Sequence, residues 1–378
     1  MVVITDMNIV SNIKSQIIPS VQSTNYIIGS DLLDNLYRTI VIRKKAFSSF
    51  LVLSDGIVFN LYGQKIVRAL QKLGKPIVIS LIPVGEQSKN IALLPEIIKP
   101  YFQHNFDRKS CLIALGGGVV TDLGGFLASI LLRGISFINI PTTLLGQVDA
   151  AIGGKSGVDF WFSKNQMYKN MIGVINQPSL VISDVETLKT LPEREILNGL
   201  GEIVKYWVGW SKPTLKQLLT IKTPEKWLKD SFQVEELAKT ISICQRIKLN
   251  VVTKDPFEKS GERQKLNLGH TVGHALESAA KGELSHGEAV AIGLIAAAKI
   301  SVLTKMLSNS TYKLIWETIK SLNLPVIIKG INREEVLKAM EYDKKGNTFV
   351  LIKDIGIINT GCQVPINIIN KALKEIVL

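Results

Sequence analysis

Short apolar runs alternate with a segment of helical periodicity in the first half of the chain. Four such runs end at turn signals of glycine, proline or aspartate, at residues 50–53, 76–82, 111–115 and 135–140. Between the first two, residues 58–73 carry apolar side chains at helical spacing and stop at Gly74. Strands that alternate with helices indicate βαβ units and a largely parallel sheet.

Helical patterns replace the strand signals after about residue 184. The predicted helices cover residues 193–209, 234–254, 268–281, 287–306 and 311–322. We therefore predict an α/β plus all-α protein: an N-terminal Rossmann-like parallel-sheet domain (residues 1–184) followed by a mainly helical domain (residues 185–378). The active site is expected in the cleft between the two domains.

Composition and charge exclude several function classes. The net charge of +13 is spread along the whole chain, without a basic tail, which favours anionic small molecules over nucleic acid as partners. The apolar stretch at 289–303 is interrupted by Lys299, so we expect a buried helix and no membrane span. The start lacks a secretory signal, and Cys111, Cys244 and Cys362 lie far apart, so a reducing cytoplasm is expected.

Three of the four histidines gather in one short stretch of the chain. His270 and His274 are spaced i, i+4, which puts both rings on one helix face, and His286 begins the next helical pattern. Two histidines and a distant carboxylate would make a catalytic metal site with an open position. The candidate carboxylate is Glu202; the alternative for it is an ordinary helix-surface glutamate paired with Lys205. The H-E-x-x-H pattern of metalloproteases is absent.

A strand, a glycine turn and a helix start follow one another at residues 112–122. The glycines at 116–118 let the backbone approach a diphosphate at the helix N-terminus, although a plain strand-to-helix turn is the alternative. The loops at 83–89 and 141–143 follow other predicted strands, as in a dinucleotide cleft. The Gly153–Gly157 segment lacks the spacing of a P-loop, which argues against a nucleoside triphosphatase.

Five blocks of sequence match one known family in order. They read GGGVVTDLGGFLAS, RGISFINIPTTLLGQVDAAIGGKSG, LNGLGEIVKYW, LNLGHTVGHALES and LSHGEAVAIG. In these blocks the chain resembles the dehydroquinate synthases, from about Asp55 to Lys345. The resemblance implies a homodimer that uses NAD and zinc, with cobalt suiting the same ligands.

The family acts on a sugar phosphate in the shikimate pathway. It converts 3-deoxy-arabino-heptulosonate 7-phosphate to 3-dehydroquinate and phosphate. The resemblance implies transient oxidation by NAD, phosphate elimination, re-reduction and an intramolecular aldol closure. NAD is regenerated in each turnover, so no net oxidation is expected.

The resemblance also gives roles to single positions. Glu202, His270 and His286 match the zinc ligands, and His274 matches a histidine of the proton-transfer machinery. Positions matching NAD contacts are Asp55, Glu86, Lys89, Gly117, Gly118, Asp122, Thr142, Thr143, Lys155, Thr190, Leu191 and Glu195. Positions matching substrate contacts are Arg133, Asp149, Lys155, Asn170, Lys205, Lys248, Arg263 and Asn267, with one lysine of Lys344 and Lys345. The predicted catalytic residues are His274, Lys155, Asp149, Lys205, Arg263 and Asn267.

Two segments depart from the family pattern. The family's Gly-Lys-Asn corresponds here to Lys169 and Asn170, while a second Lys-Asn pair at 164–165 has the family spacing but a different flank. We assign Asn170 to the site. Residues 255–263 are one residue longer than the common form, but Arg263 keeps its spacing to Asn267 and His270.

Three other functions compete with this assignment. They are another sugar phosphate cyclase, a metal-dependent polyol dehydrogenase of the same superfamily, and an inactive binding protein on the same fold. Lys248, Arg263 and Asn267 favour the dehydroquinate reaction, and the complete set of metal-ligand candidates argues against an inactive copy.

Overall fold

The computed structural model describes residues 8–16, 23–42, 47–104, 106–163, 166–211, 213, 216–217, 231–342 and 348–378. The chain divides into two compact units, Met1–Leu191 and Pro192–Leu378. The predicted boundary near residue 184 coincides with the end of β9 (Leu180–Asp184), but the 3-10 helix η7 (Val185–Thr190) still belongs to the first unit. The Gln147 amide fixes this helix by donating to the Asp184 carbonyl oxygen (3.0 Å) and to Thr187 Oγ1 (3.1 Å).

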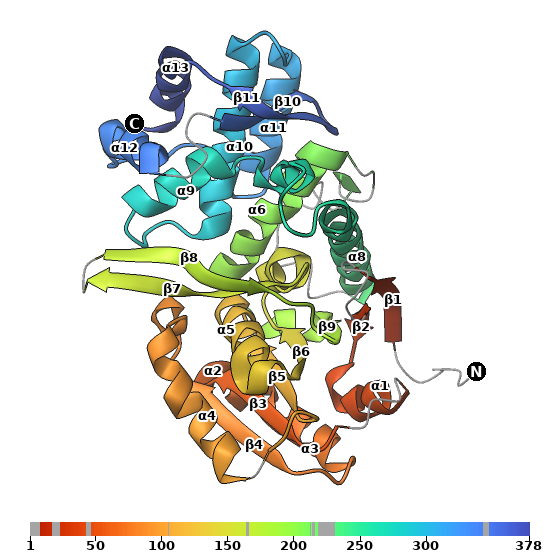
Figure 1. Cartoon of the computed structure of the whole chain (residues 1–378). Helices are drawn as coiled ribbons and strands as arrows, with labels where there is room; N and C mark the ends of the chain where they lie inside the picture. Colours follow the sequence, from red (N-terminus) through yellow and green to blue (C-terminus); the bar gives the residue numbers. More distant parts are fainter. Residues whose placement is uncertain are drawn as a thin grey trace. The chain divides into compact units, whose positions relative to one another are not determined.

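The first unit is built on a seven-stranded sheet with the order β1-β2-β9-β6-β5-β3-β4 (Figure 1). Its other strands are β1 (Asn8–Ser15), β2 (Thr24–Ser30), β3 (Phe50–Asp55), β4 (Ile77–Ile82), β5 (Cys111–Gly116) and β6 (Ser136–Pro141). β1 pairs with β2 in antiparallel fashion, whereas the remaining pairs are parallel. The largely parallel sheet and the strands β3 to β6 confirm the prediction; β1, β2 and β9 were not predicted.

Helices cover both faces of this sheet. They are α1 (Leu36–Ile42), α2 (Gly56–Val58), the π-helix η2 (Phe59–Gly63), α3 (Gln64–Gln71), α4 (Leu94–Gln103) and α5 (Gly118–Ile130). Alternate residues of a strand point to opposite faces. Phe50 and Val52 accordingly join the core of α1 and α3, while Leu51 and Leu53 join that of α4 and α5. The unit is therefore a doubly wound α/β domain.

One predicted helix is interrupted. The segment 58–73 was expected as a single helix, but a π-turn at Phe59–Gly63 separates α2 from α3. The Phe59 ring lies where a Cβ on Gly63 would be, 2.3 Å from the nearest ring atom. The helix register therefore widens where Phe59 packs over a residue without a side chain.

A two-stranded antiparallel ribbon leaves the sheet after β6. It consists of β7 (Lys155–Ser163) and β8 (Gln166–Ile175) and is the long arrow pair in Figure 1. The ribbon packs on α5, where a Cβ on Gly125 would lie 2.2 Å from Ser156 Oγ. This ribbon was not predicted, because its residues lack a strong alternating pattern.

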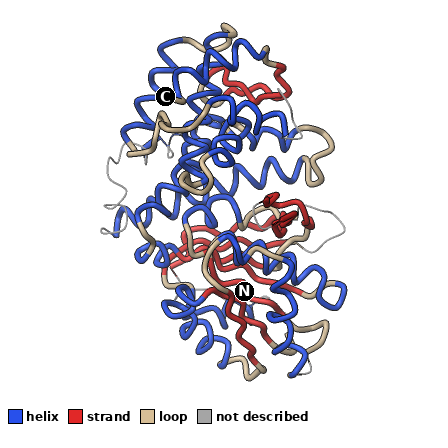
Figure 2. Tube along the Cα trace, turned by 90° about the vertical axis from the view of Figure 1, so that its left-hand side faces the viewer, coloured by secondary structure: helices blue, strands red, loops and turns tan. Residues whose placement is uncertain are grey.

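The second unit is mainly helical, as predicted (Figure 2). Its elements are α6 (Glu193–Trp210), α8 (Ser231–Lys254), η9 (Glu262–Asn267), α9 (His270–Ala279), α10 (His286–Leu303), α11 (Asn309–Ser321), α12 (Arg333–Tyr342), β10 (Thr348–Asp354), β11 (Ile357–Gln363) and α13 (Ile366–Ile376). The five predicted helices appear as α6, α8, α9, α10 and α11. The β10–β11 hairpin, α12 and α13 were not predicted.

Helix α10 is the core of this unit. Almost every residue from Ala289 to Ser301 is buried, which confirms the predicted buried helix. By length and composition α10 could cross a membrane, but 72% of it is buried inside the protein. Ser301 Oγ accepts a hydrogen bond from the Ile352 backbone N–H (2.9 Å), which ties the hairpin β10–β11 to this helix.

Candidate functional site

Glycines let three helices of the second unit approach one another closely. A Cβ on Gly201 in α6 would lie 2.2 Å from the Gly287 carbonyl oxygen in α10. A Cβ on Gly293 in α10 would lie 1.9 Å from the Gly269 carbonyl oxygen, just before α9. Any side chain at these positions would push the helices apart. Each close approach lies next to one of the predicted metal ligands Glu202, His270 and His286.

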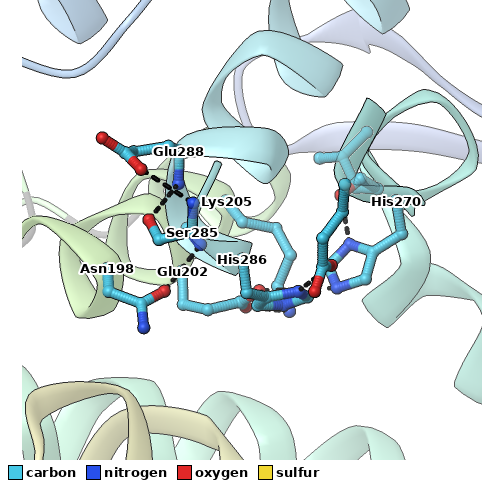
Figure 3. Close-up of polar contacts among 10 residues, drawn as sticks. Asn198, Glu202, Lys205, His270, Ser285, His286 and Glu288 are labelled. Carbon is cyan, nitrogen blue, oxygen red and sulfur yellow. Dashed lines mark hydrogen bonds and ion pairs between the residues drawn. The ribbon is translucent and has the colours of Figure 1, made fainter. Parts of the chain in front are cut away.

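The three predicted ligands converge as a result (Figure 3). The Nε2 atoms of His270 and His286 lie 3.4 and 3.3 Å from Glu202 Oε1, and one ligand atom from each residue lies within 4.8 Å of the others. A tetrahedral zinc ion with bonds of about 2.0–2.1 Å would separate neighbouring ligand atoms by about 3.3 Å. The side chains therefore fit a zinc or cobalt ion in both type and spacing.

Lys205 lies against the same carboxylate. Its ammonium group contacts Glu202 Oε2, and both side chains are almost completely buried, at 1% and 0% exposure. The i, i+3 pairing with Lys205 was the alternative considered for Glu202, but the pair is buried rather than on a surface. A buried ion pair needs close compensation because desolvation is costly.

Hydrogen bonds orient both imidazole rings. His270 Nδ1 lies 3.0 Å from the Leu268 carbonyl oxygen, so it donates its proton there and leaves Nε2 to bind a metal. His286 Nδ1 lies 3.3 Å from Glu277 Oε2. The start of α10 is fixed by a capping box between Ser285 and Glu288, and the Gly287 N–H donates to Asn198 Oδ1 (2.7 Å).

The pKa values of the two histidines are shifted in opposite directions. Burial lowers the pKa of His270 well below its usual value, and the attraction of Glu202 offsets this only in part. Burial also opposes charge on His286, but hydrogen bonds to Glu202 and Glu277 raise its pKa to about 9. His270 is thus neutral near pH 7, and its Nε2 lone pair faces a carboxylate oxygen. Two facing acceptors favour a cation between them.

His274 completes the predicted histidine cluster. Its ring centroid lies 5.1 Å from that of His270 and 5.9 Å from that of His286, and its side chain is exposed. The spacing prediction that the three rings gather is therefore confirmed. The exposed position suits a group that exchanges protons with a bound molecule.

The other predicted residues of the second unit lie on α6, α8 and η9. Lys248 is buried in α8, and Asn267 ends η9, three residues before His270. Arg263 is buried, and one guanidinium nitrogen donates to the Pro256 carbonyl oxygen (2.8 Å). Glu195 in α6 accepts a hydrogen bond from Asn198 Nδ2 (3.2 Å).

Asp255 shapes the extended segment before Arg263. Its carboxylate accepts hydrogen bonds from the backbone N–H groups of Lys259 (2.8 Å), Ser260 (3.2 Å) and Arg263 (3.1 Å). Burial would raise the pKa of Asp255, but these donors hold it at about 2. The one-residue extension is therefore folded around a carboxylate rather than left open.

A second buried charge cluster lies in the first unit. The Lys89 ammonium lies 2.5 Å from Asp122 Oδ2 and donates to Asn170 Oδ1. The Asn170 N–H donates to Asp159 Oδ1 (2.8 Å), and the Asp159 N–H donates to the Lys89 carbonyl oxygen (2.8 Å). Burial would lower the pKa of Lys89, but Asp122, Glu86 and Asp159 raise it. Three predicted residues, Lys89, Asp122 and Asn170, are thus in one network.

Sequence reasoning missed Asp159. Its side chain is 1% exposed, and burial raises the pKa of its carboxyl group. An acidic residue inside the apolar segment of β7, between Val158 and Phe160, was the signal that could have revealed it. Asn170 itself has a positive φ of 56°, which asparagine tolerates better than most residues.

The glycine loop lies where the strand order reverses. β5 and β4 lie on opposite sides of β3, so the loops after β3 and β5 flank a topological switch point. Asp55 ends β3 and caps α2 by accepting from the Val58 N–H (2.9 Å), while Gly117 and Gly118 begin α5. A Cβ on Gly117 would lie 3.0 Å from Thr143 Cγ2, so a side chain there would crowd Thr143. The N-terminus of α5 suits a diphosphate.

The remaining predicted residues of the first unit lie on its loops and short helices. Glu86 begins η3 (Glu86–Ser88), Thr142 follows β6, and Asp149 lies in the π-helix η6 (Gly146–Ala150). Lys155 begins β7 and is exposed, and Arg133 is exposed with a φ of 65°. Thr190 Oγ1 lies 2.6 Å from the Tyr62 hydroxyl, and Leu191 follows η7. Lys344, Lys345 and the pair at 164–165 lie outside the described residues.

The chain matches two family models in succession. The model described as 3-dehydroquinate synthase N-terminal matches residues 79–198, and the model described as 3-dehydroquinate synthase C-terminal matches residues 199–346. Curated relatives named 3-dehydroquinate synthase include one from Crocosphaera subtropica, 39% identical over 86% of this chain and 89% of that protein. Another, from Thermodesulfovibrio yellowstonii, is 41% identical over 86% of this chain and 89% of that protein.

Two solved structures share the fold of this chain. A 2-deoxy-scyllo-inosose synthase complexed with carbaglucose-6-phosphate, NAD+ and Co2+ has a TM-score of 0.85 and 22% identity, covering 97% of this chain and 99% of that chain. The 2-epi-5-epi-valiolone synthase from Streptomyces hygroscopicus subsp. jinggangensis, with NAD+ and Zn2+ bound, has a TM-score of 0.81 and 24% identity, with coverages of 95% and 98%. At these identities the likeness shows the fold alone.

Proposed function

Because the chain belongs to the 3-dehydroquinate synthase family, we propose that it converts 3-deoxy-arabino-heptulosonate 7-phosphate to 3-dehydroquinate and phosphate. It is then a phosphate-eliminating lyase of the shikimate pathway. The observation that carries the proposal is the match of both family models across residues 79–346, which includes the buried cluster of Glu202, His270 and His286.

The cluster in the second unit holds the metal ion in this proposal. Glu202, His270 and His286 supply three ligands, and an open position remains for substrate oxygens, as in catalytic zinc sites. When bound, the ion acts as a Lewis acid on substrate oxygens and NAD accepts and returns one hydride. Lys205 adds positive charge beside Glu202, which favours anionic groups of the substrate.

The chain's own side chains orient the substrate and move protons. Lys248, Arg263, Asn267, Arg133 and Asn170 are proposed to bind its phosphate, carboxylate and hydroxyl groups, since arginine and lysine suit such anions. His274, exposed beside the two histidine ligands, is proposed to exchange a proton with the substrate. Asp149, Lys155 and Lys205 complete the proposed catalytic set, with one lysine of Lys344 and Lys345 at the phosphate.

The first unit is the proposed NAD-binding domain, and the second the proposed metal- and substrate-binding domain. The N-terminus of α5 with Gly117 and Gly118 would receive the diphosphate, because its first N–H groups have no partner within the helix. The rest of the NAD molecule would be held by the Lys89 network and by the other proposed contacts, which are Asp55, Glu86, Thr142, Thr143, Thr190, Leu191 and Glu195. A homodimer is proposed on the same family grounds, and a cytoplasmic location on the wide spacing of the three cysteines.

The test is phosphate release from 3-deoxy-arabino-heptulosonate 7-phosphate with NAD and zinc, with NADH absorbance recorded throughout. We expect stoichiometric phosphate and 3-dehydroquinate with no lasting NADH. Removing zinc with a chelator should stop the reaction, and adding zinc or cobalt should restore it. Accumulating NADH would indicate a dehydrogenase, and phosphate release only from another sugar phosphate would indicate a different cyclase.

A further inference from the structure

The two ring nitrogens of His286 face two different carboxylates. Nε2 lies 3.3 Å from Glu202 Oε1, and Nδ1 lies 3.3 Å from Glu277 Oε2. The Glu277 side chain is 16% exposed and thus mostly withdrawn from water. Glu277 is absent from the set of metal, cofactor and substrate residues assigned above, although it touches one of the metal ligands directly.

Only Nε2 of His286 lies at the metal cluster, because it faces the same Glu202 oxygen as His270 Nε2, whereas Nδ1 faces Glu277 outside that cluster. A carboxylate accepts hydrogen bonds, so the contact with Glu277 requires a proton on Nδ1. This contact leaves Nε2 to face Glu202 and the open position. A metal-ligating histidine generally donates its second nitrogen to a carboxylate or carbonyl in this way, which holds the ring and makes it a stronger ligand.

His270 provides a comparison inside the same site. Its Nδ1 donates to the backbone carbonyl of Leu268 at 3.0 Å, so its orientation comes from the main chain. The Nε2 atoms of both histidines consequently point to the same Glu202 oxygen. For His286 the corresponding acceptor is a side chain, and this role can therefore be removed by substitution.

The fold places Glu277 where it can act. In α9, Glu277 follows His270 by seven residues and His274 by three, so all three lie on one face of the helix. α9 packs closely on α10, since a Cβ on Gly273 would lie 3.1 Å from the Ala289 carbonyl oxygen. Glu277 thereby reaches His286, the first residue of α10.

We propose that Glu277 is a positioning residue that holds His286 as an Nε2 metal ligand. The proposal deepens the proposed function, because it rests on the same metal site. Glu277 does not touch the metal or the substrate in this role. It acts through His286, by keeping the ring in one orientation and one tautomer and by strengthening its bond to the ion.

The test measures metal binding without substrate. Zinc affinity is determined by competition with a chelator, and the visible absorption of the cobalt-loaded protein reports ligand geometry. Glu277→Ala should weaken zinc binding about 10- to 100-fold and alter the cobalt spectrum. Glu277→Gln should weaken it less, since the amide oxygen can still accept the Nδ1 proton but lacks the charge.

Glu283→Gln is the matched control. Glu283 is exposed in the connection between α9 and α10, three residues before His286, so the substitution removes the same charge nearby. It should leave zinc affinity and the cobalt spectrum as in the parent protein. If Glu277→Ala proves too unstable to purify, the Glu277→Gln variant carries the test against the same control.

Two results would overturn the proposal. One is an unchanged zinc affinity and cobalt spectrum in the Glu277 variants, and the other is an equal loss in Glu283→Gln. Failure of the proposed function looks different: a parent protein that binds zinc normally but releases no phosphate leaves the positioning role intact. A parent protein that binds neither zinc nor cobalt refutes both proposals.

Discussion

The two buried charge clusters differ in how their polar atoms are matched. In the first unit, the Lys89 ammonium meets Asp122 and Asn170, and the Asn170 N–H meets Asp159, so donors face acceptors. In the second unit, His270 Nε2 and Glu202 Oε1 face each other at 3.4 Å, although His270 is largely neutral near pH 7. At this contact two acceptors face each other, although Glu202 also meets Lys205 and His286.

The difference indicates that the first cluster has a structural role and that the second binds a cation. A network in which each donor meets an acceptor is stable by itself and holds a loop in place. Converging acceptors are stabilised only when a proton or a metal ion lies among them. We therefore expect the Lys89 cluster to stabilise the first unit without metal, and the Glu202 cluster to gain stability from zinc.

The largest effect is expected from Glu202→Ala. The change removes one metal ligand and takes from Lys205 the carboxylate that balances it. Breaking a buried ion pair costs about 3–5 kcal/mol of unfolding free energy. Zinc should be lost at the same time. Urea unfolding and metal analysis of the purified protein check both results.

A double variant separates charge balance from metal binding. Lys205→Met removes the buried cation, so adding it to Glu202→Ala should recover much of the lost stability, whereas zinc should remain absent. Zinc bound at one ion per chain in Glu202→Ala would refute the ligand assignment.

Lys89→Met tests the expectation that the Lys89 cluster stabilises the first unit without a metal. It removes the ammonium group between Asp122 and Asn170 and leaves the carboxylates of the cluster close together. We expect about 3 kcal/mol less stability, at the low end for a buried pair, because the Asp122 side chain is 19% exposed. Zinc content should equal that of the parent protein. Loss of zinc in this variant would contradict the view that the clusters are independent.

Much of the two clusters could be predicted from the sequence. The spacing of His270, His274 and His286 and the apolar surroundings of Glu202 indicated a metal site, because i, i+4 periodicity and clustering are local properties. The wider family resemblance then supplied Lys89, Asp122 and Asn170. The five helices of the second unit and the strands β3 to β6 followed from hydrophobic periodicity.

What could not be predicted depends on long-range packing. Asp159 and Glu277 acquire partners only when β7 meets the Lys89 loop and α9 meets α10. Gly201, Gly287 and Gly293 allow the helix contacts that bring the ligands together, and their partners lie far away in the sequence or on another helix. The ribbon β7–β8 and the hairpin β10–β11 lack a strong alternating pattern.

A third prediction concerns Asp184, a buried carboxyl group of the first unit that makes stability depend on pH. Burial raises the pKa of Asp184 to about 6, although it accepts hydrogen bonds from the N–H groups of Leu32, Leu33 and Glu186. In the unfolded chain the carboxyl group has its ordinary pKa of 3.8. At pH values between 3.8 and about 6, the folded protein therefore keeps a proton on Asp184 that the unfolded chain has lost. The contribution of Asp184 to stability therefore falls by about 2–3 kcal/mol as pH rises from 4 to 7.

Asp184→Asn isolates this contribution from that of the histidines. Asparagine has one acceptor oxygen, so the variant should lose a hydrogen bond and be less stable than the parent at pH 4. The deficit should narrow by about 2–3 kcal/mol towards pH 7, because only the parent has a buried group to ionise. Urea unfolding of both proteins at several pH values gives the difference. A deficit independent of pH would contradict the raised pKa.

The smallest effect concerns the capped start of α10. Ser285 Oγ accepts from the Glu288 N–H (3.4 Å), and Ser308 Oγ accepts from the Thr311 N–H (3.0 Å) at the start of α11. Replacing either serine by alanine should cost about 1 kcal/mol of stability. Only Ser285→Ala should also weaken zinc binding, by a few-fold, because His286 is the first residue of α10. Equal zinc affinity in the two variants would mean that the cap does not help to position His286, and that the close contact at Gly201 and Gly287 and the contact with Glu277 suffice.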